Sequence, residues 1–259
     1  IQACVSPLWD TCLAMIGLLD AGLAPDHPAL VKAAQWLLKE QVITGGDWQI
    51  KAKSVPPGGW AFEFHNDIYP DLDDTAEIVM ALDRVKLPDE IEKSAAVDRA
   101  VQWLLGMQSS NGGWAAFDKD NTKTLISMVP FADFGEALDP PSVDVTAHIL
   151  EMLGQLGYGP EHPSVSKALD YLLSEQEDDG AWFGRWGVNY TYGTGAVLPA
   201  LAALGVGFES DHVERAVRWV LQHQNIDGGW GESCASYVDP QFRGRGPSTA
   251  SQTSWTLLA

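Results

Sequence analysis

One sequence pattern recurs four times and limits what this chain can fold into. Each copy reads Lys or Arg, Ala, an aromatic residue, an aliphatic residue and Gln, and then reaches a Trp after a glycine-rich turn. The apolar positions have a helical period and the glycines interrupt it, so each copy predicts a helix followed by a loop. Such self-similarity is typical of repeat architectures. The predicted glutamine–tryptophan pairs are Gln41 with Trp48, Gln108 with Trp114, Gln176 with Trp182, and Gln224 with Trp230.

A second type of helix alternates with these repeats. Its small, apolar faces suit burial on most sides, whereas the Gln–Trp helices carry more charge and suit an outer layer. We therefore predict an all-α fold, an α/α toroid with five inner and four outer helices. A closed ring of six pairs needs more helices, so the predicted barrel is incomplete. The inner helices start near Asp10-Thr11, Asp74-Thr75, Asp144-Val145-Thr146, Gly193-Thr194 and Gln252-Thr253.

The Gln and Trp residues of the repeat have a structural interpretation of their own. A Trp can pack on its neighbour, and a Gln amide can bind free backbone groups at helix ends. Because both recur in every copy, we expect them to hold the fold together and not to act in catalysis. Residues 1–259 are then part of one α/α-barrel domain, and the ends at Ile1 and Ala259 suggest a piece of a longer protein.

Composition narrows the function. With 259 residues and 46% hydrophobic residues, the chain is expected to be globular. A net charge of −19 argues against nucleic acid, which requires a basic surface. The sequence has no run of 18 apolar residues and no recognisable signal peptide. Cys4, Cys12 and Cys234 are an odd, scattered set that suits a reducing compartment better than a disulfide framework.

Three carboxylates lie within four residues, at Asp71, Asp73 and Asp74. Pro70 cannot lie inside a helix, so the following helix starts after it and the aspartates occupy its cap and first turn. Free N–H groups and the helix dipole favour anions there, and N-capping is one interpretation. Three acids exceed what a cap needs, and like charges this close favour a protonated form. The second interpretation is therefore that the motif holds a proton for chemistry.

With the four repeats around it, Asp71-Leu72-Asp73-Asp74-Thr75-Ala76 resembles the motif of the triterpene cyclases, and most of all of bacterial squalene–hopene cyclases. The resemblance covers essentially the whole chain. Oxidosqualene cyclases carry Cys where this sequence has Asp74, so that branch is disfavoured. Supporting stretches include Gly58-Gly59-Trp60-Ala61-Phe62, Asp144-Val145-Thr146-Ala147-His148 and Phe183-Gly184-Arg185-Trp186-Gly187.

The resemblance implies an enzyme, an intramolecular transferase or isomerase that cyclises squalene to a pentacyclic hopanoid without a metal or other cofactor. It implies that Asp73 is the proton donor, that Asp71 and Asp74 sharpen its acidity, and that His148 is a protonated partner. Aromatic faces stabilise carbocations where water is excluded. The residues that the resemblance places on this wall are Trp9, Phe62, Phe117, Trp186 and Tyr192, with Phe117 standing where some relatives carry Tyr.

The resemblance also implies features of a longer parent protein. These are a second helical domain, a hydrophobic channel that faces a membrane, and peripheral (monotopic) attachment to its cytoplasmic side; a homodimer is compatible with them. The 259-residue piece alone is expected to be soluble and inactive.

Other functions remain open from the residues alone. Clustered Asp can hold Mg²⁺ in a terpene synthase that works by ionisation, but no second carboxylate motif completes that site. Asp118-Lys119-Asp120-Asn121 begins like a calcium loop, yet its twelfth position is Val129 and not Glu. A zinc prenyltransferase needs a metal-spaced His near Cys234, which is missing. A non-catalytic toroid that binds protein partners, and a cyclase of another linear isoprenoid, are the remaining alternatives.

Overall fold

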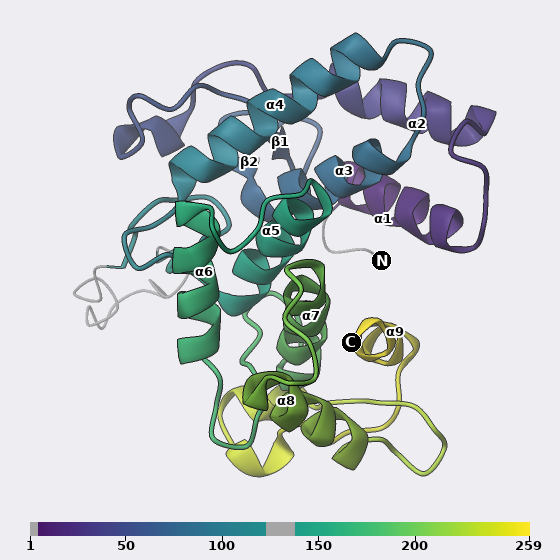
Figure 1. The fold of residues 1–259 in the computed structure, drawn as a ribbon, viewed down its shortest axis with the longest axis vertical. Helices are drawn as coiled ribbons and strands as arrows, with labels where there is room; N and C mark the ends of the chain where they lie inside the picture. The colour runs from purple at the N-terminus through teal and green to yellow at the C-terminus, as the bar shows by residue number, and fades with distance from the viewer. Residues whose placement is uncertain (1–4, 123–137) are drawn as a thin grey trace. The chain divides into compact units, whose positions relative to one another are not determined.

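The computed structural model describes residues 5–122 and 138–259 and is almost entirely helical (Figure 1). Contacts divide it into two compact units, residues 1–110 with 114–140 and residues 111–113 with 141–259. In the described residues, five predicted inner helices alternate with four predicted outer ones, as the repeat indicated. The inner helices are α1 (Pro7–Asp20), α3 (Leu72–Arg84), α5 (Val143–Gln155), α7 (Tyr190–Ala203) and α9 (Ala250–Leu258); the outer ones are α2 (Pro28–Lys39), α4 (Glu90–Met107), α6 (Pro163–Ser174) and α8 (Asp211–Gln222).

The first unit is built around α3. Every residue of this helix from Leu72 to Leu82 is buried, whereas α2 and α4 bury only part of their surfaces. The helices α1, α2 and α4 all contact α3. A short 3-10 helix, η1 (Asp47–Ile50), and two antiparallel strands, β1 (Trp60–Ala61) and β2 (Pro70–Asp71), occupy the long loop before α3. The strands lead the chain directly into the acidic motif.

The second unit is built around α7, which contacts α5 and α9 most extensively (Figure 1). Its residues from Tyr190 to Leu198 are all buried, which fits the predicted inner layer. The outer helices α6 and α8 contact α5 and α7 respectively. After α8 the chain forms two 3-10 helices, η4 (Cys234–Tyr237) and η5 (Pro240–Phe242), before it enters α9.

The prediction that the inner helices are buried on most sides was wrong for two of the five, α1 and α9. In α1 the buried residues are Leu8, Cys12 and Met15, and in α9 only Thr256 is buried. The physical reason is the number of packed neighbours. Within the described residues, the main partners of α1 are α2 and α3 and that of α9 is α7, whereas α3 and α7 are packed by helices on several sides.

Each repeat Trp bridges its loop to the preceding outer helix. Its indole N–H donates to a backbone carbonyl near the end of that helix, at 2.7–2.9 Å. In the first repeat this Trp is Trp60, so the predicted pairing of Gln41 with Trp48 was wrong. The loop after Gln41 is longer than in the other copies, and the glycine-rich turn that precedes the bridging Trp is Gly58-Gly59. The four bonds are Trp60 to Leu37, Trp114 to Leu104, Trp182 to Leu172, and Trp230 to Val220.

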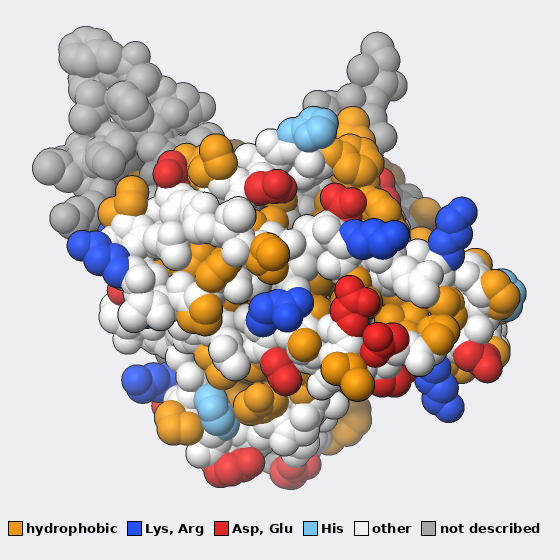
Figure 2. Space-filling view, turned by 90° about the horizontal axis from the view of Figure 1, so that it is seen from above, with side chains coloured by type: hydrophobic (Ala, Val, Ile, Leu, Met, Phe, Trp, Pro, Cys, Tyr) orange, Lys and Arg blue, Asp and Glu red, His pale blue; other side chains and the backbone are white. Residues whose placement is uncertain are grey.

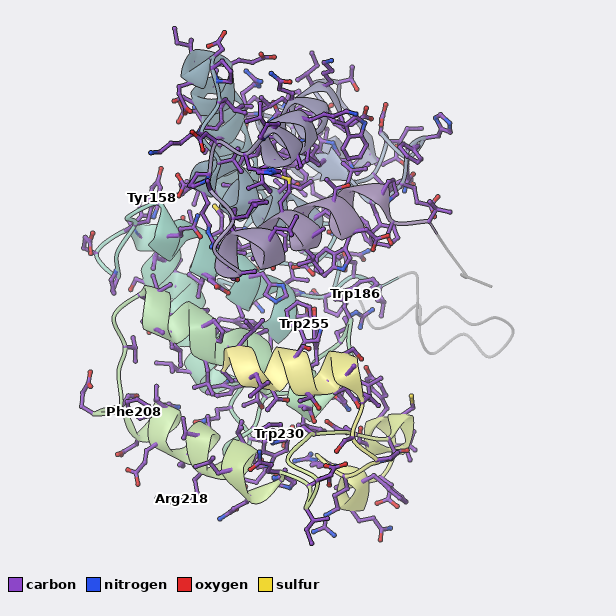
Figure 3. All side chains as sticks on the ribbon, turned by 90° about the vertical axis from the view of Figure 1, so that its right-hand side faces the viewer. Tyr158, Trp186, Phe208, Arg218, Trp230 and Trp255 are labelled. Carbon is purple, nitrogen blue, oxygen red and sulfur yellow. The ribbon has the colours of Figure 1, made fainter. Side chains whose placement is uncertain are left out.

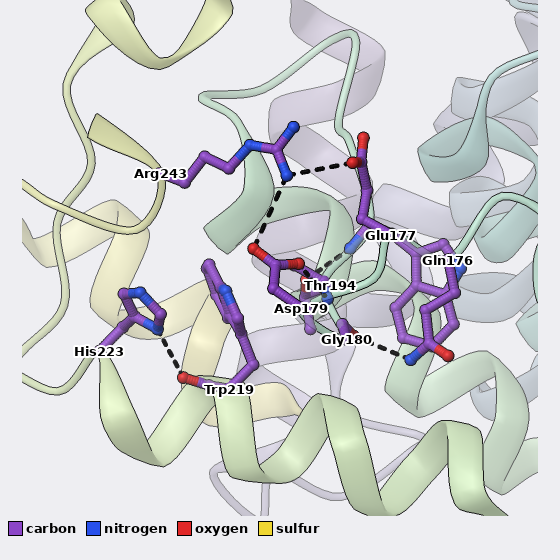
Figure 4. Close-up of polar contacts among 10 residues, drawn as sticks. Gln176, Glu177, Asp179, Gly180, Thr194, Trp219, His223 and Arg243 are labelled. Atoms are coloured by element: carbon purple, nitrogen blue, oxygen red, sulfur yellow. Dashed lines mark hydrogen bonds and ion pairs between the residues drawn. The ribbon is translucent and has the colours of Figure 1, made fainter. Parts of the chain in front are cut away.

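The repeat Gln binds backbone groups, as predicted. The Gln41 amide nitrogen donates to the carbonyl oxygens of Gly58 and Ala96, each at 2.8 Å, so it joins its own loop to α4. The Gln176 amide nitrogen likewise donates to the carbonyl oxygen of Gly180 in its loop (Figure 4). It also donates to the carbonyl oxygen of His212 of α8. These bonds connect successive outer helices, which is a structural role.

A charged contact fixes the loop after η5 in the second unit. The Arg243 guanidinium pairs with the carboxylates of Glu177 and Asp179, at 3.0 and 3.7 Å (Figure 4). It also lies 4.2 Å from the ring centroid of Tyr190, the first residue of α7. The ion pairs and the cation–π contact therefore hold this loop against the start of an inner helix.

The surface agrees with the acidic composition. On the face drawn in Figure 2, Lys and Arg side chains stand singly among acidic, hydrophobic and other groups. Within the described residues, no helix has both the length and the apolar character that crossing a bilayer requires.

Candidate active site

Backbone geometry presents the acidic motif at the start of α3. The Asp71 carboxylate caps the helix, accepting hydrogen bonds from the N–H groups of Asp73 at 2.7 Å and Asp74 at 3.2 Å. On the strand side, Asp71 pairs in register with Trp60. The Thr75 hydroxyl donates to the Asp71 carbonyl at 2.6 Å and accepts from the Trp60 N–H at 2.9 Å. N-capping by Asp71 is thus confirmed, and it accounts for one of the three acids.

All three carboxyl groups are buried. Asp71, Asp73 and Asp74 are 7%, 8% and 2% exposed. Burial, followed by repulsion from Asp73, raises the pKa of Asp71 to about 8. Burial, followed by repulsion from Asp71 and Asp73, raises the pKa of Asp74 to about 10. The raised pKa values of Asp71 and Asp74 favour protonated carboxyl groups in the cluster at neutral pH.

Further titratable groups surround the motif in the first unit. Glu77, one turn along α3, is 4% exposed, and its charge also raises the pKa of Asp74. Cys12 of α1 is fully buried, and burial together with Glu77, Asp74 and Asp73 raises the pKa of its thiol. The Cys12 thiol donates to the carbonyl oxygen of Trp9 at 3.2 Å. The helix that carries Trp9 therefore turns its Cys12 toward the acids.

The other two candidate aromatic residues of the first unit lie in loops. Phe62 follows β1 directly and is half-buried. Phe117 is also half-buried, and its N–H donates to the Asp139 carboxylate at 2.7 Å. The neighbouring Ala116 carbonyl accepts a hydrogen bond from Leu72 at the start of α3, at 2.8 Å. Phe117 is thus one residue away from a backbone contact with the acidic motif.

Three rings from three helices meet in the second unit. The His148 ring of α5 stacks on the Trp255 ring of α9, with ring centroids 5.8 Å apart. Trp255 is labelled on α9 in Figure 3. Tyr192 of α7 meets both rings edge-on, at 6.1 Å from His148 and 5.1 Å from Trp255. His148 and Tyr192 are buried, at 1% and 7% exposed. The sequence predicted these two residues and missed Trp255.

Asp144 holds the backbone of Trp186. Its Oδ2 accepts from the N–H groups of Arg185 at 2.9 Å and Trp186 at 2.7 Å, and its Oδ1 accepts from the Ser142 hydroxyl at 2.6 Å. Asp144 is fully buried, whereas the Trp186 side chain is 47% exposed. The backbone of Trp186 is therefore fixed although its ring lies partly in the open (Figure 3).

Comparison with known proteins places this geometry in a family. The family model described as the squalene–hopene cyclase C-terminal domain matches residues 5–259. The chain belongs to this family. It is 58% identical to the squalene–hopene cyclase of Alicyclobacillus acidocaldarius over 258 residues, which cover 100% of the chain and 41% of that protein. It is 47% identical to the squalene–hopene cyclase of Zymomonas mobilis, covering 99% and 40%. The chain thus spans about 40% of the length of these relatives.

The fold is shared with more distant members of the class. The type II terpene cyclase MstE from Scytonema superposes with a TM-score of 0.65 at 21% identity, over 97% of this chain and 62% of that one. A likeness at this identity shows the fold alone. The all-α prediction, with its alternating inner and outer helices, is therefore confirmed for a squalene–hopene cyclase C-terminal domain.

The position of Trp255 follows a pattern that repeats in the inner helices. The threonines Thr75, Thr194 and Thr253 each accept the backbone N–H of a repeat Trp, at 2.9–3.1 Å, so they mark equivalent positions of three inner helices. Thr146 has the same place in the sequence of α5. Two residues after this Thr come Glu77, His148, Ala196 and Trp255, and two residues before it come Asp73, Asp144, Tyr192 and Ser251. Counting from each Thr therefore points to Trp255, Asp144 and Glu77, together with the small residues Ala196 and Ser251.

Metal binding was the main alternative chemistry. Among the residues that the structure describes, no group of three or more His, Cys, Asp or Glu side chains could hold a metal ion. In the segment that begins like a calcium loop, Asp120 accepts hydrogen bonds from the N–H and the hydroxyl of Ser110, each at 2.8 Å. Val129, the twelfth position of that loop, lies outside the described residues, as does Cys4.

Proposed function

We propose that the protein containing this chain cyclises squalene to a pentacyclic hopanoid, hopene or hopanol, in a cation cascade started by an acid. The observation that carries the proposal is the buried carboxyl cluster of Asp71, Asp73 and Asp74 at the start of α3. Family membership and 58% identity to a squalene–hopene cyclase support it. The chain spans about 40% of such relatives, so the activity is proposed for the full-length protein.

An alkene is a very weak base, so its proton donor must be neutral before the reaction and a stable anion after it. We assign the donor role to Asp73. Asp71 and Asp74, whose pKa values are raised, can stay neutral at pH 7 and donate hydrogen bonds to the Asp73 carboxylate after transfer. The N–H groups of the first turn of α3 favour the same anion. His148 is assigned as the cationic partner of the cluster.

Once the terminal alkene is protonated, each carbocation is attacked by the next double bond until the rings close. Loss of a proton gives hopene, and addition of water with loss of a proton gives hopanol, so the donated proton is returned. Aromatic faces stabilise such cations without bonding to them. We assign this role to Trp9, Phe62, Phe117, Trp186 and Tyr192.

Incubation of the full-length protein with squalene, followed by mass spectrometry of the products, tests the proposal. We expect turnover that resists EDTA, declines at alkaline pH as the carboxyl groups of Asp71 and Asp74, whose pKa values are raised, ionise, and disappears in Asp73→Asn. Asp83→Asn is the matched control, because Asp83 is exposed in the last turn of the same helix. Sensitivity to EDTA would indicate metal chemistry. Cyclisation of another linear isoprenoid in place of squalene would mean that this isoprenoid is the substrate. No turnover of either would favour a non-catalytic binding module.

Squalene dissolves in membranes and not in water, and we propose that the full-length protein takes it from a bilayer as a peripheral protein. Flotation with phospholipid vesicles should recover the protein in the lipid fraction, and salt should not release it if apolar contacts hold it. A homodimer is compatible with the family resemblance, and the molecular mass of the full-length protein in detergent would detect it.

A further inference from the structure

Asp139 is a buried carboxylate that no assigned role uses. It is 7% exposed and lies close after the residues that the structure leaves undescribed. Its Oδ2 accepts hydrogen bonds from the N–H groups of Phe117 and Asp118, both at 2.7 Å, and its Oδ1 accepts from that of Ala116 at 3.3 Å. Three successive backbone donors therefore converge on one side chain, and such charge-assisted bonds offset the cost of burying it.

The segment that Asp139 holds is also bonded to the acidic motif. The Ala116 carbonyl accepts from the N–H of Leu72 at 2.8 Å. Leu72 is the first residue of α3 and lies between Asp71 and Asp73, and its N–H has no acceptor within the helix. One peptide group thus separates the Asp139 contacts from the backbone that carries the acids. The negative charge of Asp139 also helps to raise the pKa of Asp71, after burial and Asp73.

We infer that Asp139 is a positioning residue for the cyclisation. It holds residues 116–118, so that Phe117 keeps a fixed position relative to the start of α3. The inference rests on the proposed function for its kinetic consequence, whereas its structural content can be tested without turnover. Catalysis depends on reacting groups being held close to their productive positions. A displacement of about 1 Å can lower the rate about 100-fold.

The test compares the same substitution at two carboxylates of one loop. Asp139→Asn leaves a single acceptor oxygen for three donors, and Asp139→Ala leaves none. Asp120→Asn is the control, because the Asp120 carboxylate also binds backbone in this loop, but at Ser110 and not at residues 116–118. Its φ of 55° is one that Asn adopts readily.

In the full-length protein, hydrogen exchange should be about 10-fold faster or more at the Phe117 and Asp118 amides in Asp139→Asn, and faster still in Asp139→Ala. These amides should stay within about 2-fold of the parent in Asp120→Asn. With squalene as the probe, kcat should fall about 10- to 100-fold in Asp139→Asn, with KM within about 3-fold, and should be unchanged in Asp120→Asn.

Unchanged exchange at residues 117–118 in Asp139→Asn would overturn the inference, as would equal kcat values in Asp139→Asn and Asp120→Asn. If Asp139→Ala fails to fold, the two Asn variants decide by themselves. If the parent protein does not turn over squalene, the proposed function fails, and the exchange comparison still tests whether Asp139 holds the segment.

Discussion

The indole nitrogen of Trp60 lies 2.7 Å from the carbonyl oxygen of Leu37 and donates a hydrogen bond to it. Trp48 in the same long loop is almost equally buried, at 2% exposed against 0%, and packs edge-on against Trp103. In the described part of the chain the Trp48 indole N–H has no hydrogen-bond acceptor. The two tryptophans therefore differ mainly in one bond to the outer helix.

Replacing each of these tryptophans by Phe should separate packing from that bond. Both variants lose indole volume, but only Trp60→Phe removes a hydrogen bond to the Leu37 carbonyl, which keeps the 3.1 Å bond from the Glu40 N–H. We expect Trp60→Phe to lower the free energy of unfolding by about 0.5–1.5 kcal/mol more than Trp48→Phe. Urea denaturation of the two variants measures the difference. An equal loss in both would mean that the repeat bridge adds no stability.

The hydroxyl of Thr75 links α3 to the strand β1, because it accepts the backbone N–H of Trp60. Thr75→Val keeps the shape of the side chain but leaves the Trp60 N–H and the Asp71 carbonyl without their bonds to the hydroxyl. The unsatisfied Trp60 N–H should cost about 1–3 kcal/mol, because the Asp71 carbonyl, at the N-cap, also accepts the first bond of the helix. Thr75→Ser, which keeps the hydroxyl, should cost about 1 kcal/mol. Denaturation of both variants checks this. A Ser variant as unstable as the Val variant would assign the effect to the lost methyl group.

The acid cluster should make stability fall as pH rises. Burial and mutual repulsion raise the pKa of Asp71 to about 8 and that of Asp74 to about 10, against about 3.9 in the unfolded chain. Between about pH 4 and pH 8 the folded state therefore binds more protons than the unfolded state. Each excess proton lowers the free energy of unfolding by about 1.4 kcal/mol per pH unit in that window.

The double variant Asp71→Asn with Asp74→Asn removes this dependence while other titrating groups stay. We expect the variant to lose less stability than the parent between pH 5 and pH 8 in urea denaturation, since its amides cannot ionise. Parallel profiles for the two proteins would show that the carboxyl groups are already ionised at pH 5.

The layering and the acid motif could be predicted from the sequence because both are local signals. Helical period identifies α2, α4, α6 and α8, and Pro70 with three aspartates defines the start of α3. The pairing of Gln41 with a Trp could not be predicted reliably. Two glycine-rich turns follow it, and only three-dimensional packing decides that Trp60 and not Trp48 reaches α2.

The side chains that hold the site could not be predicted for a related reason. Asp139 and Asp144 bind backbone groups that are 21–23 and 41–42 residues away in sequence. No local pattern marks Asp139, and the place of Asp144 two residues before Thr146 does not show which backbone groups it binds. An aspartate near a helix start is interpreted first as a cap. Trp255 became recognisable only once the threonines of successive inner helices were seen to bind the repeat tryptophans in the same way.

Asp144 offers the sharpest test of the aromatic wall in the second unit. Trp186 is too exposed for packing alone to fix it, so its position should depend on the bond from its N–H to Asp144 Oδ2. In Asp144→Asn one side of the carboxylate becomes a donor, so the N–H groups of Arg185 and Trp186, or that of Val145, lose their acceptor. We expect kcat for squalene to fall about 10- to 100-fold. Ser142→Ala removes only the bond from its own hydroxyl to Oδ1, which still accepts the Val145 N–H, and should lower kcat less than about 3-fold. If Ser142→Ala were as damaging as Asp144→Asn, the start of α5 and not the Trp186 backbone would be what Asp144 secures.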